Sequence, residues 1–217
     1  MKPYYQDSHA TIYLADCLEI LPDIKPGTAQ VILTDPVWPN AIPELKGSDD
    51  PLGLFTRAAE YFPRISDRLI VILGCDSDPR FLSGVPDEMD FFRMVYLRRV
   101  PPCYKGSLLY SADIAYVFGP GWLPGNGTRV LPGDFVHASR GARDPVNTHP
   151  CYRSFEDMRW LIGHYSREGQ TILDPFMGSG TTLVAAKAAG RKAIGIEIEE
   201  KYCDIAVKRL AQTVMDI

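Results

Sequence analysis

The feature that most constrains the fold of this chain is the segment from Gln170 to Glu197, QTILDPFMGSGTTLVAAKAAGRKAIGIE. It predicts a short apolar strand, a turn with two glycines, a helix of small residues and a second strand that ends at an acid. Gly190 stops the helix, and residues 192–198 predict a buried strand with Glu197 at its carboxyl end. This order of elements is typical of an open α/β sheet that binds a ligand at the turn.

The turn itself limits the kind of ligand. Gly178 and Gly180 lack the Cβ atoms that would keep a ligand away from the backbone. A dinucleotide site needs a third glycine where Leu183 stands, and a phosphate-binding loop needs a lysine, which is absent between Gln170 and Ala186. A carboxylate at Glu197 can accept both hydroxyl protons of a ribose. An adenosine cofactor without a phosphate chain fits better, with S-adenosylmethionine as the obvious candidate, and a turn without a ligand is the alternative.

A second informative segment, AQVILTDPVWPN, spans residues 29–40. Its apolar run predicts a buried parallel strand that leads directly into Asp35, Pro36 and Trp38, in the crevice where such sheets bind ligands. The two prolines at 36 and 39 hold the acid and the indole on a stiff, extended loop.

An acid and an indole placed in this way can hold a flat heterocycle that carries an exocyclic amine. The Trp38 ring stacks on the heterocycle, and the Asp35 carboxylate and the Pro36 carbonyl accept the two amine protons. Two acceptors outside the ring plane favour a pyramidal nitrogen, which frees its lone pair for attack on a sulfonium methyl group. The alternative is an Asp-Pro turn that only ends a strand.

Together the two motifs resemble those of the amino-methyltransferases that modify N6 of adenine or N4 of cytosine in DNA. The cofactor signature of that family, Asp-Pro-Phe-X-Gly-X-Gly, corresponds to residues 174–180. The catalytic signature, Asp-Pro-Pro-Tyr, departs twice, at Val37 and at Trp38. The resemblance covers residues 10–75 and 147–212, and it implies a Rossmann-like methyltransferase fold with a seven-stranded, mostly parallel sheet and helices on both faces.

The order of the motifs resembles the circularly permuted beta class, because the catalytic motif precedes the cofactor motif. The resemblance implies direct in-line methyl transfer at Asp35, Pro36 and Trp38, without a metal. It favours N6 of adenine over N4 of cytosine, because aspartate opens the motif. The implied cofactor contacts are Asp16, Cys17, Asp35, His149, Asp174, Pro175, Phe176, Gly178, Ser179, Gly180, Thr181, Glu197 and Ile198.

The pattern of strands and helices agrees with one α/β methyltransferase domain over residues 1–217. We expect strands at 11–16, 29–35, 68–75, 94–99, 111–118, 170–174 and 192–198. We expect helices at 17–23, 52–63, 154–166, 179–189 and 200–213.

The net charge of −4 is unusual for a protein that binds nucleic acid tightly, but the charge is unevenly distributed. The segment from Arg98 to Arg153 contains seven basic residues and three acidic residues. This stretch includes a glycine- and proline-rich loop at about 119–147 that we interpret as a small target-recognition region. Its candidates for phosphate contacts and base stacking are Trp122, Arg129, Phe135, His137, Arg140 and Arg143.

The expected partner is DNA, with the base either flipped from a duplex or presented in a single strand. No helix or ribbon suited to the major groove is evident, so recognition of only a short DNA sequence and a homodimer are both left open. The absence of a leader or a long apolar run, together with five scattered cysteines, predicts a cytoplasmic protein without a membrane span, bacterial or phage-encoded. RNA methylation and a non-catalytic cofactor-binding regulator are the alternative functions.

Overall fold

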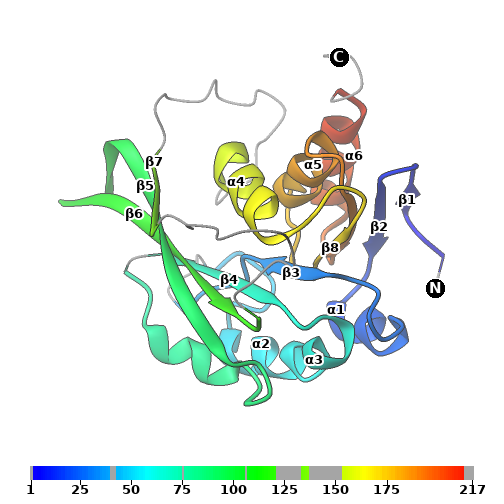
Figure 1. Ribbon diagram of the computed structural model, residues 1–217, viewed down its shortest axis with the longest axis horizontal. Helices are drawn as coiled ribbons and strands as arrows, with labels where there is room; N and C mark the ends of the chain where they lie inside the picture. Colours follow the sequence, from blue (N-terminus) through cyan, green and yellow to red (C-terminus); the bar gives the residue numbers. More distant parts are fainter. Residues whose placement is uncertain are drawn as a thin grey trace, which may run out of the picture.

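The computed structural model describes residues 2–39, 43–74, 76–105, 107–120, 133–136 and 153–212. A mixed sheet of nine strands divides the protein into two helical layers, with α4, α5 and α6 on one face and α1, α2 and α3 on the other (Figure 1). The prediction of a mostly parallel α/β sheet with helices on both faces is confirmed. The helices are α1 (Cys17–Ile20), α2 (Pro51–Ala59), α3 (Phe62–Ile65), α4 (Phe155–Tyr165), α5 (Thr181–Ala188) and α6 (Glu200–Gln212).

The strand order is β1-β2-β9-β8-β3-β4-β6-β5-β7, and the five strands from β2 to β4 run parallel to one another. The two central strands, β8 and β3, are apolar and almost wholly buried, as expected for a sheet covered on both faces. The strands are β1 (Tyr5–Gln6), β2 (Ala10–Leu14), β3 (Val31–Thr34), β4 (Leu69–Gly74), β5 (Phe91–Lys105), β6 (Leu108–Phe118), β7 (Asp134–Val136), β8 (Thr171–Asp174) and β9 (Lys192–Glu197).

Each of the seven predicted strands is present, but the predicted number is wrong because β1 and β7 add two more. These two strands have two and three residues, too few for any periodicity to show in the sequence. The predicted helix at 52–63 is two helices, because Pro63 has no N–H to continue the first one. The predicted helix at 17–23 ends as a 3-10 turn at Leu21–Asp23, which contains Pro22.

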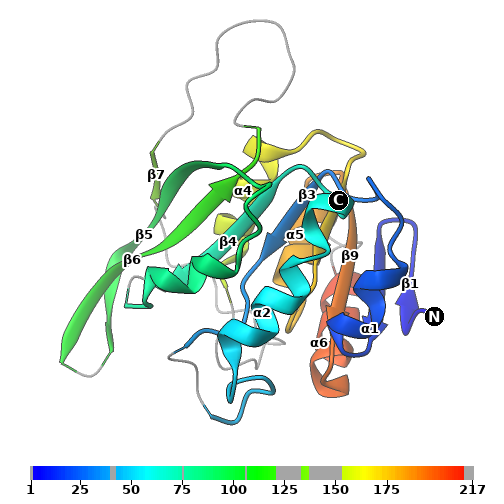
Figure 2. The ribbon, with the colours of Figure 1, turned by 90° about the horizontal axis from the view of Figure 1, so that it is seen from below.

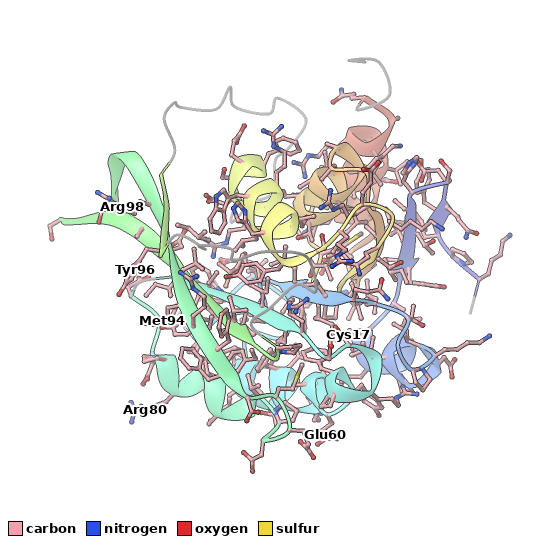
Figure 3. The ribbon with its side chains drawn as sticks, in the orientation of Figure 1. Cys17, Glu60, Arg80, Met94, Tyr96 and Arg98 are labelled. Atoms are coloured by element: carbon pink, nitrogen blue, oxygen red, sulfur yellow. The ribbon has the colours of Figure 1, made fainter. Side chains whose placement is uncertain are left out.

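The antiparallel pair β5 and β6 forms a ribbon that sequence analysis did not predict. Strand β4 pairs with β6 only at residues 113–118, whereas β5 and β6 remain paired as far as Lys105 and Leu108. The outer part of this pair therefore projects beyond the sheet (Figure 2). Met94, Tyr96 and Arg98 lie exposed along the outer side of β5 (Figure 3).

The predicted recognition loop falls mostly outside the described residues, which include neither 121–132 nor 137–152. This leaves out Trp122, Arg129, His137, Arg140 and Arg143. The described strand within it, β7, pairs in parallel with β5 at Tyr96–Arg98, so this part of the loop continues the sheet.

The turn between β8 and α5 is fixed by its contact with α6. Gly180 has a φ of +75°, and a Cβ at this position would lie 2.6 Å from the Cβ of Ala206 on α6. The buried Arg209, also on α6, donates a hydrogen bond from Nη1 to the carbonyl oxygen of Ser179 at 2.6 Å. Gly180 therefore serves both the backbone conformation and the close approach of a helix.

We predict that Gly180→Ala lowers the free energy of unfolding more than Gly169→Ala does. Both glycines have positive φ, but a Cβ at Gly169 would meet no atom within 4 Å. The control should lose about 1 to 2 kcal/mol from backbone strain, and Gly180→Ala about 2 to 5 kcal/mol because overlap with Ala206 is added. Urea unfolding measures both losses, and equal losses would contradict the packing role of Gly180.

Candidate active site

The two motifs singled out in the sequence meet at the carboxyl ends of neighbouring parallel strands. Strand β3 leads to Asp35 and strand β8 ends at Asp174, and the two strands pair at Ile32 and Leu173. The chain continues from β3 to β4 on one side and from β8 to β9 on the other. Because the two connections diverge, a crevice forms between them, which is the usual ligand site of open α/β sheets.

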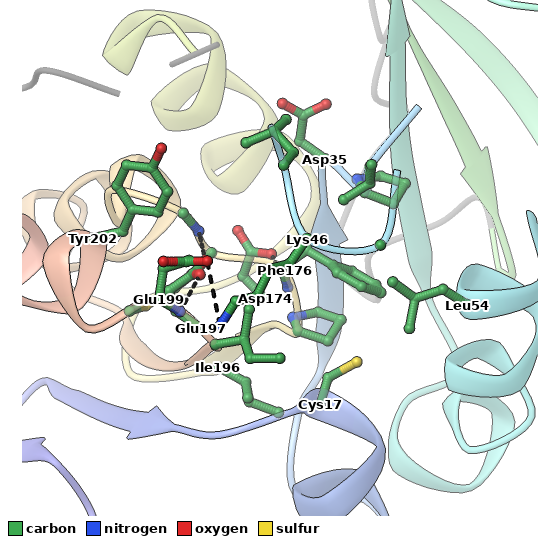
Figure 4. Close-up of a pocket in the computed structure, with 18 of the residues that line it drawn as sticks. Cys17, Asp35, Lys46, Leu54, Asp174, Phe176, Ile196, Glu197, Glu199 and Tyr202 are labelled. Atoms are coloured by element: carbon green, nitrogen blue, oxygen red, sulfur yellow. Dashed lines mark hydrogen bonds and ion pairs between the residues drawn. The ribbon is translucent and has the colours of Figure 1, made fainter. Parts of the chain in front are cut away.

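A cavity of about 390 Å³ occupies this crevice (Figure 4). Its volume lies in the range of small-molecule sites, roughly 300 to 1,000 Å³. Residues from both motifs line it, so the structure brings together two stretches that are far apart in the sequence. The predicted site residues in its wall are Asp16, Cys17, Asp35, Pro36, Trp38, Asp174, Pro175, Phe176, Gly178, Ser179, Thr181, Glu197 and Ile198.

Two predicted contacts are not part of this wall. His149 lies outside the described residues. Gly180 belongs to the turn but does not line the cavity, because the position of its missing side chain faces Ala206 of α6. Close packing of α5 on the sheet is provided by Gly195 on β9, where a Cβ would lie 2.8 Å from Leu183.

Hydrogen bonds hold the glycine turn and the acid of β9 in one arrangement. The backbone N–H of Gly178 donates to Oε2 of Glu197 at 3.0 Å, and the N–H of Glu199 donates to Oε1 at 2.8 Å (Figure 4). On the strand before the turn, Oδ1 of Asp174 accepts from the N–H of Phe176 at 3.1 Å. Each oxygen of Glu197 keeps a second lone pair, so a ligand with two adjacent hydroxyl groups can still donate to this carboxylate.

Asp16, one of the predicted cofactor contacts, has a structural task. Its side chain caps α1 by accepting from the N–H of Leu18 at 2.9 Å. Cys17, the first residue of that helix, is buried as a free thiol, and burial raises its pKa to about 12. A thiol with so high a pKa remains neutral at physiological pH, so it offers packing and not charge.

The Trp38 indole is anchored on the neighbouring strand β4. Its Nε1 donates to the carbonyl oxygen of Ile72 at 3.2 Å. Its six-membered ring lies against Gly74, where a Cβ would be 2.7 Å from Cζ3. The ring is therefore fixed in orientation beside Asp35, and a side chain larger than glycine at position 74 would displace it.

The most important residue that sequence reasoning missed is Arg153, which precedes α4. It had been counted among the basic residues of the recognition region, but it is buried. Its Nε donates to Oδ2 of Asp35 at 2.6 Å, its Nη2 to Oδ1 of Asp35 at 3.0 Å, and its Nη1 to Oδ2 of Asp113 at 2.6 Å. Its Cζ also lies 4.2 Å from the centre of the Trp38 ring. Arg153 is thus part of the site and not of a phosphate-binding surface.

A second cation reaches the cavity from the loop before α2. Nζ of Lys46 lies 3.4 Å from Oε1 of Glu199, and both residues line the cavity (Figure 4). This ion pair joins the loop to the end of β9 across the site. The Lys46 side chain is half exposed, so the pair is screened by solvent and contributes little to stability.

Acids outnumber cations in the cavity wall, and this affects their protonation. Seven aspartates and glutamates line the cavity against three lysines and arginines. Burial raises the pKa of Asp174 to about 7, partly opposed by a hydrogen bond from Thr182. Burial also raises the pKa values of Asp35, where the Arg153 guanidinium opposes the shift, and of Glu197. A cationic ligand would stabilise the ionised forms of these groups.

Among the described residues, no group of three His, Cys, Asp or Glu side chains is arranged to hold a metal ion. In the same residues, no helix has both the length and the apolar character needed to cross a membrane.

Comparison with protein families gives one match in the second half of the chain. Residues 103–208 match the N6_N4_Mtase family, described as DNA methylase. This range includes Arg153, the glycine turn and Glu197, but not Asp35 or Trp38.

Curated relatives match over short segments. The type II methyltransferase M2.DpnII of Streptococcus pneumoniae is 48% identical over 62 residues, which are 29% of this chain and 23% of the relative. M.ScaI of Streptomyces caespitosus is 64% identical over 62 residues, 29% of this chain and 20% of the relative. The DNA adenine methyltransferase YhdJ of Escherichia coli is 40% identical over 67 residues, 31% of this chain and 23% of the relative. The matches thus span about a quarter of the length of these relatives or less.

Solved structures are similar over nearly the whole chain. The M1.HpyAVI–SAM complex has a TM-score of 0.68 and 24% identity, covering 93% of this chain and 98% of that one. The PvuII DNA methyltransferase, cytosine-N4-specific, has a TM-score of 0.71 and 16% identity, covering 97% and 95%. The fold is therefore that of S-adenosylmethionine-dependent DNA methyltransferases.

The raised pKa of Asp174 predicts that part of the stability is lost as the pH rises. Between about pH 4 and pH 7 the folded state retains a proton that the unfolded state has lost, so the free energy of unfolding should fall by up to about 1.4 kcal/mol per pH unit. Asp174→Asn removes this titration. Urea unfolding across this range should show a shallower slope in Asp174→Asn and an unchanged slope in the control Asp23→Asn, an exposed site. Equal slopes in wild type and Asp174→Asn would refute the assignment.

Proposed function

We propose that this chain transfers a methyl group from S-adenosylmethionine to the exocyclic amine of a base in DNA, most favourably N6 of adenine. The observation that carries the proposal is the meeting of the glycine turn and Glu197 with Asp35 and Trp38 around one cavity. The match to the DNA methylase family and the similarity to named DNA methyltransferases support it.

In this proposal the wall of the cavity from β8 to β9 holds the cofactor. Glu197 accepts the ribose hydroxyl protons, because its two oxygens are already oriented by Gly178 and Glu199. The turn at Asp174–Gly178 contacts the methionine part, and Asp16 lies at the adenine end. The acidic wall suits a ligand with a positively charged sulfonium. When bound, the cofactor would supply the methyl group carried by that sulfonium.

The wall that follows β3 holds the base. The Trp38 ring stacks on the base, and the Asp35 carboxylate and the Pro36 carbonyl accept the two amine protons. Held in this way, the amine nitrogen would direct its lone pair at the methyl group that bound S-adenosylmethionine supplies, with the sulfur as leaving group, and Asp35 would pass the proton released by the amine to solvent. Catalysis comes from orientation and from fixed charges, which need no rearrangement during the reaction.

The remaining parts of the chain agree with the permuted beta class. The catalytic strand β3 precedes the cofactor strand β8 in sequence, although they are neighbours in the sheet. Residues 1–217 then form one methyltransferase domain. The projecting β5–β6 ribbon is the described element best shaped for the major groove, which admits a two-stranded ribbon. A homodimer would add a second such ribbon and enlarge the contact with DNA.

A non-catalytic S-adenosylmethionine-binding regulator is the second candidate. It is favoured by one observation, the occupation of both Asp35 oxygens by Arg153. Val37, where the catalytic signature has proline, adds to it.

We predict that the wild type transfers labelled methyl groups to DNA and that Asp35→Ala lowers the rate at least about 100-fold, because a fixed acceptor of the amine protons is lost. Calorimetry should show that the variant still binds S-adenosylmethionine, with affinity reduced less than about tenfold. Asp23→Ala, at an exposed position outside the cavity wall, is the control. Full transfer by Asp35→Ala would exclude this catalytic role, and cofactor binding without transfer by the wild type would favour the regulator.

The target base can be identified from the reaction product. We expect mass spectrometry of DNA from a random-sequence library to show N6-methyladenine, with sequencing of the modified positions giving the context. Exclusive N4-methylcytosine would contradict the preference for adenine while leaving the chemistry intact. An excess of unlabelled RNA should not compete, and strong competition would indicate an RNA substrate.

A further inference from the structure

We propose that Arg153 mimics the target base, resting in the base site of the free protein and leaving it when a base enters. The inference rests on the proposed function, because it assigns the surface of Asp35 and Trp38 to the base. It adds a residue that governs access to that surface.

The contacts of Arg153 reproduce those expected of the substrate. A guanidinium is planar and carries several N–H donors in that plane, like an aminopurine or aminopyrimidine. Nε and Nη2 donate to the two oxygens of Asp35 at 2.6 and 3.0 Å, the carboxylate that would accept one proton of the exocyclic amine. The Cζ lies 4.2 Å from the centre of the Trp38 ring, a distance suited to a stacked planar group.

The base and Arg153 cannot use this surface together. Trp38 is held by its hydrogen bond to Ile72 and by close packing on Gly74, so the ring cannot rotate to present a second stacking surface to the base. While Arg153 remains bidentate, both oxygens of Asp35 accept from a cation and are weakened as acceptors for a neutral amine. Base entry therefore requires that the guanidinium move.

Asp113 gives the displaced guanidinium a place to remain. It lies on β6 opposite Gly74 of β4, and its Oδ2 accepts from Nη1 of Arg153 at 2.6 Å. Arg153 can thus exchange its contacts with Asp35 and Trp38 for solvent while it keeps one charge-assisted hydrogen bond. This contact with Arg153 explains why an acid occurs on β6 beside the buried residues Ala115 and Val117.

The charge balance links this exchange to the cofactor. When Arg153 leaves, Asp35 loses its close cation in a wall already rich in acids. A bound sulfonium offsets that loss, so the exchange is easier in the cofactor-bound protein. We therefore expect bases to bind after the cofactor, and poorly without it.

The test measures nucleoside binding to Arg153→Ala, with Arg153→Met as a second variant that keeps the aliphatic packing. The probes are deoxyadenosine and deoxycytidine, titrated calorimetrically with the cationic analogue sinefungin bound, above neutral pH because burial raises the pKa of Asp35. At least one nucleoside should bind about tenfold more tightly than to wild type, because no mimic has to be displaced. Arg159→Ala, an exposed arginine on α4, is the matched control and should not change the affinity. Unchanged or weaker binding in both Arg153 variants overturns the proposal.

Guanidinium chloride at millimolar concentration separates a mimic from a fixed positioning residue. If Arg153 is a mimic, free guanidinium should inhibit methyl transfer by Arg153→Ala competitively with DNA, raising KM and leaving kcat unchanged. If Arg153 positions the base, guanidinium should instead restore a lost kcat, and that result would overturn the proposal.

The two proposals fail in different ways. Absence of methyl transfer by the wild type contradicts the proposed function, whereas nucleoside binding still reports on Arg153 because it requires no reaction. Transfer by the wild type together with nucleoside affinity unaffected by Arg153→Ala and Arg153→Met contradicts the mimic alone.

Discussion

The parallel pairing of β3 with β8 is the interaction on which the site depends. These strands are separated by more than a hundred residues in sequence, yet their pairing at Ile32 and Leu173 places Asp35 and Asp174 at the same edge of the sheet. Each strand is buried on both faces, so a shift in register would expose apolar side chains and remove their contacts with the helical layers. The geometry of the cavity is thus set by the hydrophobic core.

The second constraint is electrostatic. Burial raises the pKa values of Asp35, Asp174 and Glu197, which means that the fold destabilises the ionised form of each acid. Arg153 relieves this cost at Asp35, and hydrogen bonds from backbone N–H groups relieve it at Glu197. Among the described residues, Asp174 forms no ion pair with a lysine or an arginine, and its pKa of about 7 leaves it poised to ionise when a positive ligand arrives. The site therefore has a resident cation beside Asp35 and room for a cationic ligand beside Asp174.

Local patterns predicted much of this structure, and non-local contacts account for what was missed. Apolar runs located the seven longer strands, and the glycine turn with the acid of the next strand predicted the crevice, because both signals lie within one short continuous segment of the sequence. Arg153 was misplaced because its partners Asp35 and Asp113 are distant in sequence, and nothing near residue 153 indicates a buried cation. Asp113 was a usable signal, since an acid within the apolar run ADIAYVF needs a cation if that face is buried. The β5–β6 ribbon was missed because strand length beyond the sheet depends on the partner strand.

The departure of residues 35–38 from the Asp-Pro-Pro-Tyr signature has a structural explanation in the neighbouring strand β4. Valine at position 37 gives up the fixed φ that a second proline would provide, which loosens the link between Asp35 and the stacking ring. Trp38 recovers that order in another way, because its indole N–H reaches the carbonyl oxygen of Ile72 and its larger ring fills the space left by Gly74. A tyrosine has no donor at the position of the indole nitrogen. The substitutions at 37 and 38 are therefore complementary, with rigidity moved from the backbone of the loop to the contact between the ring and β4.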